Sequence, residues 1–409
     1  MQLDAAGQPH LTYCTNVHPG ETLGELRQII RGPVSEVARR WRQEYCASGG
    51  VLPFGMGLRL SAAAATELEG PGRCEEFRQL LQDRDLYLFS LNGFPYGNFH
   101  DGKVKDLVYT PDWRTRERLA YTDRLARLGD AIAPRGQALS LSTVPGGYKK
   151  HLDNESVGQI RERLLQHAAC LLEIRDQRGR SIRLALEPEP DCLFETTRQA
   201  AEFLQTEILG KAGLASFGKR TGLSAAQSEI FLRDQLGLCV DACHLAVAYE
   251  NPESALGYIQ SAGLRVAKLQ ISSALSLELQ GDEGDTAQLE QLADFDDGIY
   301  LHQVVARSRD GQLSRFRDLD DAIRHQLANP QPQQWRVHFH VPVFRSALGL
   351  FGSTQQSLRE LLRYCQREAL CDHYEVETYT WGVLPTALRG DSLTESLVEE
   401  LVWARDALL

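Results

Sequence analysis

Short apolar runs alternate with longer segments of helical period along almost the whole chain. The apolar runs, which predict strands, lie at 11–18, 53–61, 87–92, 138–143, 182–187, 236–241, 265–271, 335–341 and 374–379. Segments with apolar residues three and four positions apart, which predict helices, lie at 34–46, 73–84, 110–133, 155–176, 195–209, 252–262, 354–369 and 392–408. Such regular alternation predicts a parallel sheet, and about eight repeats predict a closed (β/α)8 TIM barrel of the α/β class.

Nine strand candidates are one more than the barrel needs. The surplus strand is one of 265–271, 335–341 and 374–379, which surround the long segment 276–334. That segment contains a hairpin pattern, with apolar residues before and after Asp310-Gly311. We therefore expect a single domain over 1–409, with an insertion at 276–334 and the helix 392–408 closing the barrel.

The run Ile182 to Leu186 is followed by Glu187 and then by two prolines in the sequence EPEP. Side chains alternate along a strand, so Leu184 and Leu186 share one face and Glu187 lies on the other. Pro188 has no N–H group and should end the strand. If helices cover the leucine face, Glu187 points into the mouth of the barrel, where such folds place their chemistry.

The same parity argument sorts polar residues on the other strands. The residues expected to point inward near strand ends are Asp241, His338 or His340, and Glu375 or Glu377, with His244 three positions after Asp241. The second member of each pair lies nearer the carboxyl end of its strand, which favours His340 and Glu377. His338 is expected to be a hydrogen-bonded core histidine.

Several carboxylates in one apolar-walled mouth repel one another unless they are protonated or share a cation. Three carboxylates with an imidazole suit a divalent ion such as Mn, Mg, Co or Zn. Simpler roles exist for each residue alone: Glu187 or Glu377 could pair with Arg59 or Arg183, and Asp241 could cap a turn. The shared position of these residues at strand ends favours the metal site.

The net charge and the N-terminal sequence narrow the classes of partner and the expected cellular location. The 44 basic and 55 acidic residues give a net charge of −11, which disfavours nucleic acid and anionic membranes as partners. The first residues lack a signal-peptide pattern, and no apolar run approaches the roughly 18 residues of a membrane helix. The nine cysteines form no CxxC pair, which favours buried thiols in a reducing compartment, so we expect a cytoplasmic protein without membrane insertion.

Several segments resemble known families. LALEPEP (184–190), CVDACH (239–244) and VETYTW (376–381) resemble the xylose isomerase-like TIM barrels, a superfamily of sugar and sugar-phosphate isomerases and epimerases. The EboE family of metabolite traffic proteins is similar over a longer set: HLTYCTNVHPGE (10–21), NGFPYGNFH (92–100), PDW (111–113), VHFHVPVF (337–344) and VETYTW. Members of that family are the barrel proteins encoded by a small bacterial operon, which is linked to moving or maturing a metabolite precursor.

The resemblance implies one divalent metal ion held by Glu, Asp, His and Glu from strands 5 to 8. Glu187, Asp241 and Glu377 take three of these places. The strand after Asp241 carries Gln270 where a histidine is usual, so His340 is the expected fourth ligand. A ligand at His338 or Gln270, or a site with three ligands, stays open. The resemblance also implies that Glu187 and Glu377 move the substrate proton while the metal polarises its oxygens.

Further polar and aromatic residues are candidates for holding the substrate. His244 is a candidate catalytic residue, and the candidate substrate-binding residues are His18, Arg59, Asn92, Phe94, Tyr96, His100 and Gln270. Phe94, Tyr96 and Phe99 belong to a loop that could stack on a ring or cover it.

Three functions follow from this set of residues. The first is a metal-dependent isomerase or epimerase acting on a small sugar-like or polyol-like metabolite. The second is a barrel that binds and escorts a precursor without changing it, with other products of the same operon as partners. The third is phosphodiester hydrolysis of the endonuclease IV type, which the negative charge disfavours.

Overall fold

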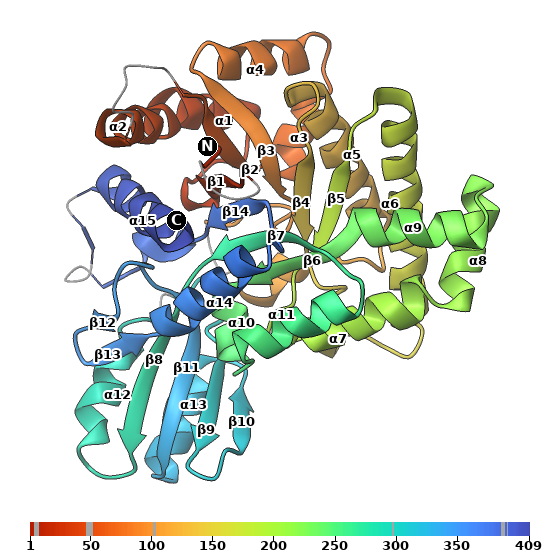
Figure 1. Ribbon diagram of the computed structural model, residues 1–409. Coiled ribbons are helices and arrows are strands. Elements are labelled where there is room, and N and C mark those ends of the chain that lie inside the picture. Colours follow the sequence, from red (N-terminus) through yellow and green to blue (C-terminus); the bar gives the residue numbers. More distant parts are fainter. Residues whose placement is uncertain (4–7, 46–51, 101–103, 297, 386–388, 391) are drawn as a thin grey trace.

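The computed structural model describes residues 1–3, 8–45, 52–100, 104–296, 298–385, 389–390 and 392–409 (Figure 1). Eight parallel strands form one sheet in the order β1-β14-β7-β6-β5-β4-β3-β2. They are β1 His10–Tyr13, β2 Phe54–Arg59, β3 Leu86–Asn92, β4 Leu139–Thr143, β5 Ile182–Leu186, β6 Leu236–Asp241, β7 Val266–Ile271 and β14 His373–Val376. A parallel bridge between Cys14 and Gly57 joins the two outer strands, so the sheet closes into the predicted (β/α)8 barrel.

Helices follow the strands and cover the outside of the barrel. They are α1 Leu23–Ile29, α2 Ser35–Tyr45, α3 Ala62–Leu68, α4 Arg73–Gln82, α5 Arg116–Ile132, α6 Ser156–Arg178, α7 Thr197–Phe203, α8 Lys211–Thr221, α9 Ala225–Gln235, α10 Ala242–Val247, α11 Pro252–Ser261, α14 Gln355–Arg367 and α15 Leu393–Leu408. The sequence pattern did not predict α1, α3, α8, α9 or α10. The last helix, α15, contacts β1, β14 and α2, where the chain ends meet.

Several expected boundaries differ from the structure: the last strand, expected to run to 379, ends at Val376. The first strand stops at Tyr13, and a 3-10 turn at Thr15–Val17 follows. Helix α5 begins after Thr115, whose side chain accepts a hydrogen bond from the Arg118 N–H and caps the helix, rather than at Pro111. The helix expected to end at 46 is described to Tyr45, and residue 46 lies outside the described residues.

A second, antiparallel sheet lies below the barrel in Figure 1. Its order is β10-β9-β11-β8-β13-β12, with β8 Ala274–Gln280, β9 Val304–Ser308, β10 Leu313–Phe316, β11 Pro332–His340, β12 Ala347–Leu348 and β13 Phe351–Ser353, and with helices α12 Asp285–Ala293 and α13 Leu319–Ala328. The expected hairpin is present as β9 and β10, which pair antiparallel.

The surplus strand candidate is 335–341, which belongs to this second sheet. β11 pairs antiparallel with β8 on one side and β9 on the other, so both of its neighbouring strands belong to the second sheet and neither to the barrel. Its alternating pattern therefore fits a two-sided antiparallel strand as well as a barrel strand. The sheet begins at Ala274 and reaches Ser353, beyond the expected insertion limits of 276 and 334. It contacts the barrel through α10 and the 3-10 turn Tyr379–Gly382.

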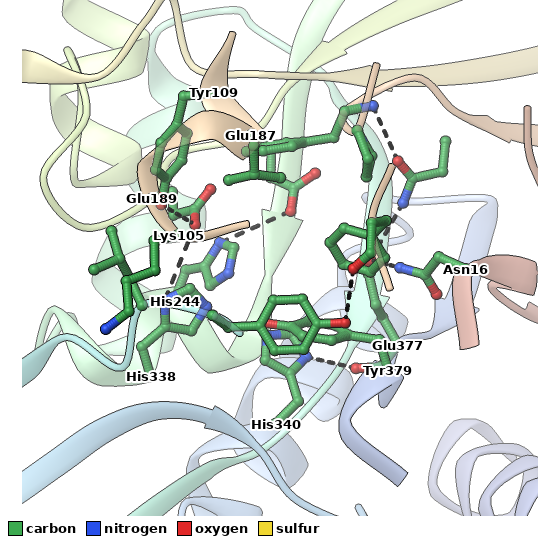
Figure 2. Close-up of a pocket in the computed structure, with 17 residues that line it drawn as sticks. Asn16, Lys105, Tyr109, Glu187, Glu189, His244, His338, His340, Glu377 and Tyr379 are labelled. Carbon is green, nitrogen blue, oxygen red and sulfur yellow. Dashed lines mark hydrogen bonds and ion pairs between the residues drawn. The ribbon is translucent and has the colours of Figure 1, made fainter. Parts of the chain in front are cut away.

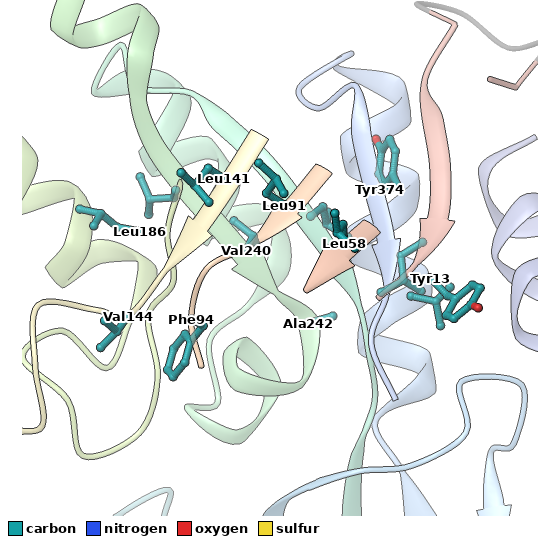
Figure 3. Packing of buried hydrophobic residues seen from close by; sticks show 14 of the residues in the cluster. Tyr13, Leu58, Leu91, Phe94, Leu141, Val144, Leu186, Val240, Ala242 and Tyr374 are labelled. Carbon is teal, nitrogen blue, oxygen red and sulfur yellow. The ribbon is translucent and has the colours of Figure 1, made fainter. Parts of the chain in front are cut away.

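The core follows the parity that the strands predicted. The residues assigned to the outer faces, such as Leu58, Leu91, Leu141, Leu186 and Val240, are buried in the main hydrophobic cluster (Figure 3). The inner face carries a fully buried ion pair between Lys268 and Glu375, with 2.7 Å between Nζ and Oε1. Glu375 thus pairs with Lys268 deep in the barrel, and Glu377 is the glutamate that reaches the mouth.

Candidate functional site

A cavity of about 50 Å³ lies at the carboxyl ends of β5, β6 and β14, against the second sheet. Figure 2 shows Glu187, Glu189, His244, His338, His340 and Glu377 around it. Its aromatic wall is formed by Phe94, Phe99, Tyr109, Tyr300 and Tyr379. Six acidic and imidazole groups thus line a small space, with room for roughly a few water molecules.

Three carboxylates meet beside this cavity, and two of them, Glu187 and Glu377, line it. Glu187 follows β5, Asp241 ends β6 and Glu377 follows β14, and one oxygen of each lies within 4.8 Å of the others. All three residues are at most 6% exposed. Among the residues that the structure describes, Glu187 Oε2, Asp241 Oδ2 and Glu377 Oε2 have no hydrogen-bond partner. Each carboxylate therefore presents one unsatisfied buried oxygen.

The remaining oxygens of Asp241 and Glu377 are fixed by donors. The Nδ2 atoms of Asn16 and Asn92 donate to Glu377 Oε1 at 2.7 and 3.2 Å. The His244 N–H and the Ser272 hydroxyl donate to Asp241 Oδ1 at 2.9 and 2.8 Å. Asp241 is thus the N-cap of α10, as the simpler interpretation proposed, but the cap uses only one of its oxygens. These hydrogen bonds fix the orientation of both carboxylates. Asp241 Oδ2 and Glu377 Oε2 are left without a hydrogen-bond partner among the described residues.

Burial and mutual repulsion shift these acids toward the protonated form. Desolvation, and then the charges of Glu377 and Asp241, raise the pKa of Glu187 well above its usual range. Desolvation and Asp241 raise the pKa of Glu377 to about 8. Arg59 and Arg183, the considered ion-pair partners, instead contact Glu21 and Asp372 at 2.7 and 3.1 Å. The carboxylates thus need protons or a cation to coexist.

Three histidines complete the wall: His244 from α10, and His338 and His340 from β11. Their Nδ1 atoms lie 3.0 Å from the Pro188 carbonyl, 2.7 Å from Gln303 Oε1 and 2.6 Å from the Glu377 carbonyl, respectively. Because a carbonyl oxygen only accepts, each Nδ1 carries the hydrogen and each Nε2 keeps a lone pair. Within the described part of the chain, Nε2 of His338 and His340 lacks a hydrogen-bond partner.

Burial keeps the rings of His244 and His338 neutral. Desolvation lowers the pKa of His244 to about 4 and lowers that of His338 well below its usual range. His338 is therefore not simply a satisfied core histidine, as the sequence suggested, because its Nε2 is buried, unpartnered and at the cavity wall. A neutral imidazole with a free Nε2 and a fixed Nδ1 is the form in which histidine binds metals.

Some predicted substrate-binding residues line the cavity and others do not. Asn92 and Phe94 line it. The Arg59 guanidinium is bound to Glu21, and the His18 ring contacts the Tyr13 hydroxyl at 3.0 Å. Tyr96 packs edge-on against Tyr121.

Two further candidates also lie behind the cavity wall. His100 Nε2 lies 2.6 Å from the Asn16 carbonyl. Gln270 Oε1 accepts a hydrogen bond from the Cys239 thiol at 3.1 Å, inside the barrel. Strand and loop position placed these residues near the mouth, but the Asn16 carbonyl engages His100 and the Cys239 thiol engages Gln270 Oε1. Among the described residues Gln270 Nε2 has no hydrogen-bond partner.

The sequence interpretation missed several residues of the wall, namely Asn16, Lys105, Tyr109, Glu189, Tyr300 and Tyr379. Glu189 was visible in the EPEP motif, two positions after Glu187, and Tyr379 was visible in VETYTW. Glu189 is buried and accepts a hydrogen bond from the Tyr109 hydroxyl at 2.7 Å, and desolvation raises its pKa to about 8. Lys105 and Tyr300 had no local signal, since each reaches the cavity from a loop.

An aromatic cover made of Phe99, Tyr300 and Tyr379 closes the cavity. The ring centroids of the three pairs lie 5.2 to 5.3 Å apart. The Tyr300 hydroxyl donates to the Phe99 carbonyl at 3.0 Å. The three rings come from the loop after β3, from the segment between α12 and β9, and from the turn after β14. The cover thus joins the barrel to the insertion.

Neither a protein-family model nor a curated protein matches the chain. Among solved structures, the probable 3-DHS dehydratase AsbF of Bacillus anthracis, involved in petrobactin synthesis, is 12% identical, covers 96% of this chain and 97% of its own, and has a TM-score of 0.45. The IOLI protein with a bound zinc atom is 11% identical, with 98% of both chains covered and a TM-score of 0.43. An L-ribulose 3-epimerase is 11% identical, with 98% of this chain and 91% of its own covered and a TM-score of 0.45. The barrel assignment rests on the strand order of the chain itself.

Proposed function

We propose that the protein is a divalent-metal-dependent isomerase or epimerase acting on a small sugar-like or polyol-like metabolite. The observation that carries this proposal is the convergence of unsatisfied buried oxygens from Glu187, Asp241 and Glu377. Buried polar atoms without partners are rare, and a shared cation satisfies all three. His340 is the proposed fourth ligand, because one of its ring nitrogens lies within 4.8 Å of a carboxylate oxygen of Asp241, and its Nε2 has no hydrogen-bond partner among the described residues. Gln270 is a weaker candidate, because its oxygen already accepts from Cys239.

Three oxygens and one imidazole nitrogen form a donor set for Mn, Mg, Co or Zn. A bound ion of this kind supplies positive charge beside a substrate oxygen. The residues around it supply orientation: Asn16 and Asn92 hold Glu377, while Ser272 and the first turn of α10 hold Asp241. The hydrogen bonds to Glu377 Oε1 and Asp241 Oδ1 keep these two ligands from rotating away when the ion leaves.

Glu187 and Glu377 are the groups that move protons. One carboxylate removes the proton from the carbon next to a substrate carbonyl, and the C–H electron pair moves toward the carbonyl oxygen. The other carboxylate returns a proton to the same carbon from the opposite face for epimerisation. For isomerisation the proton goes to the carbonyl carbon, while the proton of the adjacent hydroxyl moves to the former carbonyl oxygen and the adjacent carbon becomes the new carbonyl.

The cavity wall suits a small polar ligand with an apolar face. Lys105 brings a cation to the wall, and its Nζ lies 2.5 Å from Asp318. The aromatic cover offers ring faces to C–H groups of a sugar. Because the cavity volume is only about 50 Å³, a metabolite enters only when the cover moves. Closing behind the ligand would then exclude water from the reacting carbon.

Solvent hydrogen exchange tests this proposal without knowledge of the substrate. Full-length protein loaded with Mn²⁺ is incubated in D₂O with a panel of ketoses, aldoses and their phosphates. We expect deuterium at the carbon next to the carbonyl of at least one compound by mass spectrometry and NMR, and no incorporation with Glu377→Gln. A panel compound that binds tightly without any exchange would contradict the proposal.

A second candidate function, an EboE-like escort barrel for a metabolite precursor, is favoured by the aromatic cover. Packed rings over the cavity would retain a ligand without needing chemistry. The two functions differ in the fate of the ligand. A compound that co-purifies with the protein and is recovered unchanged after incubation with excess metal supports escort, whereas a converted compound supports the enzyme.

A further inference from the structure

The geometry points to a second divalent-cation site formed by Glu189, His244 and His338, beside the Glu187–Asp241–Glu377 centre. One ligand atom from each of these three residues lies within 4.8 Å of the others. The three side chains are buried, with exposures of 6%, 5% and 4%. This site goes beyond the proposed function, because nothing in the isomerase mechanism above requires a second ion.

His338 supplies the observation that singles out this cluster. Its Nε2 is buried and, in the part of the chain that the structure describes, has no hydrogen-bond partner. Its Nδ1–H is committed to Gln303 Oε1 at 2.7 Å, so the ring cannot satisfy Nε2 by changing tautomer without losing that bond. His244 is fixed in the same way by the Pro188 carbonyl. The two rings meet edge to face, with centroids 4.6 Å apart.

One residue, Gln303, orients two of the three ligands. Its side-chain oxygen accepts from His338 Nδ1, and its Nε2 donates to the Tyr109 hydroxyl at 3.3 Å. That hydroxyl in turn donates to Glu189 Oε1 at 2.7 Å. Outer-shell partners of this kind fix the rotamers and tautomers of metal ligands. The network gives Glu189 and His338 a common support that a chance contact between two polar residues would lack.

The ligand chemistry differs from that of the first centre. Two imidazoles and one carboxylate form a three-ligand zinc set that leaves a coordination position open. Tetrahedral zinc separates its ligand atoms by roughly 3.4 Å, given metal–ligand distances of about 2.1 Å, so a small contraction from the present spacing would complete the site. Because His338 comes from the second sheet, the barrel alone could not form it.

Metal stoichiometry tests the second site without a substrate. Metal-free full-length protein is dialysed against buffered Zn²⁺, and bound zinc is measured by elemental analysis. We expect two equivalents for the unaltered protein and for His151→Ala, which changes a histidine away from the cavity. We expect one equivalent for His338→Ala and, independently, one for Glu377→Gln. One equivalent in the unaltered protein, or two in a folded His338→Ala protein, would overturn the proposal.

The two centres can fail separately. If Glu377→Gln retains as much zinc as the unaltered protein while His338→Ala loses one equivalent, the first centre is wrong and the second stands. If His338→Ala does not fold, Glu189→Gln removes one ligand with little change in shape and must also lose one equivalent. Gln303→Ala should weaken the second ion about 10- to 100-fold.

Co²⁺ substitution identifies the ligands. Cys243 also lies within 4.8 Å of His338 and His340 in ligand-atom distance. Visible absorption without a strong near-ultraviolet thiolate band supports Glu189, His244 and His338. A strong thiolate band that Cys243→Ser abolishes would place the ion on Cys243 and overturn the assignment.

Discussion

Glu187 and Glu377 enter the cavity from β5 and from the end of β14, and one carboxylate oxygen of each lies within 4.8 Å of the other. In each residue Oε2 has no hydrogen-bond partner among the described residues. Burial and this proximity raise the pKa of both acids. The pair therefore couples three measurable properties: cation binding, proton binding and stability.

Glu377→Gln should remove the response to metal while keeping the fold. Glutamine matches the shape of the protonated acid and removes one repelling charge, so the melting temperature of the metal-free protein should be unchanged or higher. Excess Mn²⁺ should raise the melting temperature of the unaltered protein, since a ligand that binds only the folded state stabilises it. In the variant the affinity should fall at least tenfold, about 1.4 kcal/mol, as measured by calorimetric titration.

A matched control for this experiment is Glu21→Gln, which changes an acid paired with Arg59 away from the carboxylate cluster. It should retain the full metal response. Equal metal affinity in Glu377→Gln and the unaltered protein would show that Glu377 is no ligand.

The stability of the metal-free protein should fall as pH rises from 6 to 8. Unfolded glutamate titrates near 4.5, whereas burial raises the pKa of Glu377 and Glu189 to about 8 in the folded state. The folded state therefore binds more protons in this interval, and the stability contributed by the protonated acids, complete below about 4.5, is lost as pH rises through 8. Thermal unfolding in the presence of a chelator measures this slope.

Saturating Mn²⁺ should reverse the trend, because ligand carboxylates must be deprotonated and metal affinity thus rises with pH. A Glu189→Gln, Glu377→Gln double variant should show a shallower slope without metal. A slope equal to that of the unaltered protein would mean that these acids do not titrate in the interval.

Glu375→Gln should destabilise the protein strongly. Glu375 and Lys268 are both fully buried and form an ion pair of 2.7 Å, so the substitution leaves an ammonium group unpaired in the barrel. Breaking such a pair costs about 3–5 kcal/mol in the free energy of unfolding, which urea denaturation would measure. Removing both charges with Lys268→Met and Glu375→Gln should recover much of the loss. If the double variant were no more stable than the single one, unpaired charge would not explain the effect.

Gly57→Ala should destabilise the seam where β2 meets β1. A Cβ atom at Gly57 would lie 2.1 Å from Glu375 Oε2 and 2.9 Å from the Tyr13 carbonyl oxygen. Overpacking of this kind costs about 1–3 kcal/mol, measurable in the free energy of unfolding. The control is Gly24→Ala in α1, where a Cβ meets nothing closer than 3.9 Å and alanine favours the helix by roughly 0.5–1 kcal/mol. Equal stability of both variants would argue against a tight seam.

The sequence by itself determined the barrel and three of the acids at its mouth. Alternation with period two is a local property of a strand, so parity placed Glu187, Asp241 and Glu377 on the inner face, opposite leucines and valines that meet the helices. Proline after Glu187 marked the end of β5. Because parallel strands present their carboxyl ends at one rim, those positions sufficed to bring distant acids together.

Only the tertiary structure decided the rest of the site. β11 has the alternation of a barrel strand, but its pairing with β8 and β9 puts it in the second sheet, and no local pattern distinguishes these arrangements. That sheet docks against α10 and carries His338 and His340 to the cavity beside His244. Lys105 and Tyr300 arrive on loops in the same way. Docking depends on contacts between segments far apart in the chain, so it leaves no periodicity in the sequence, whereas strand parity does.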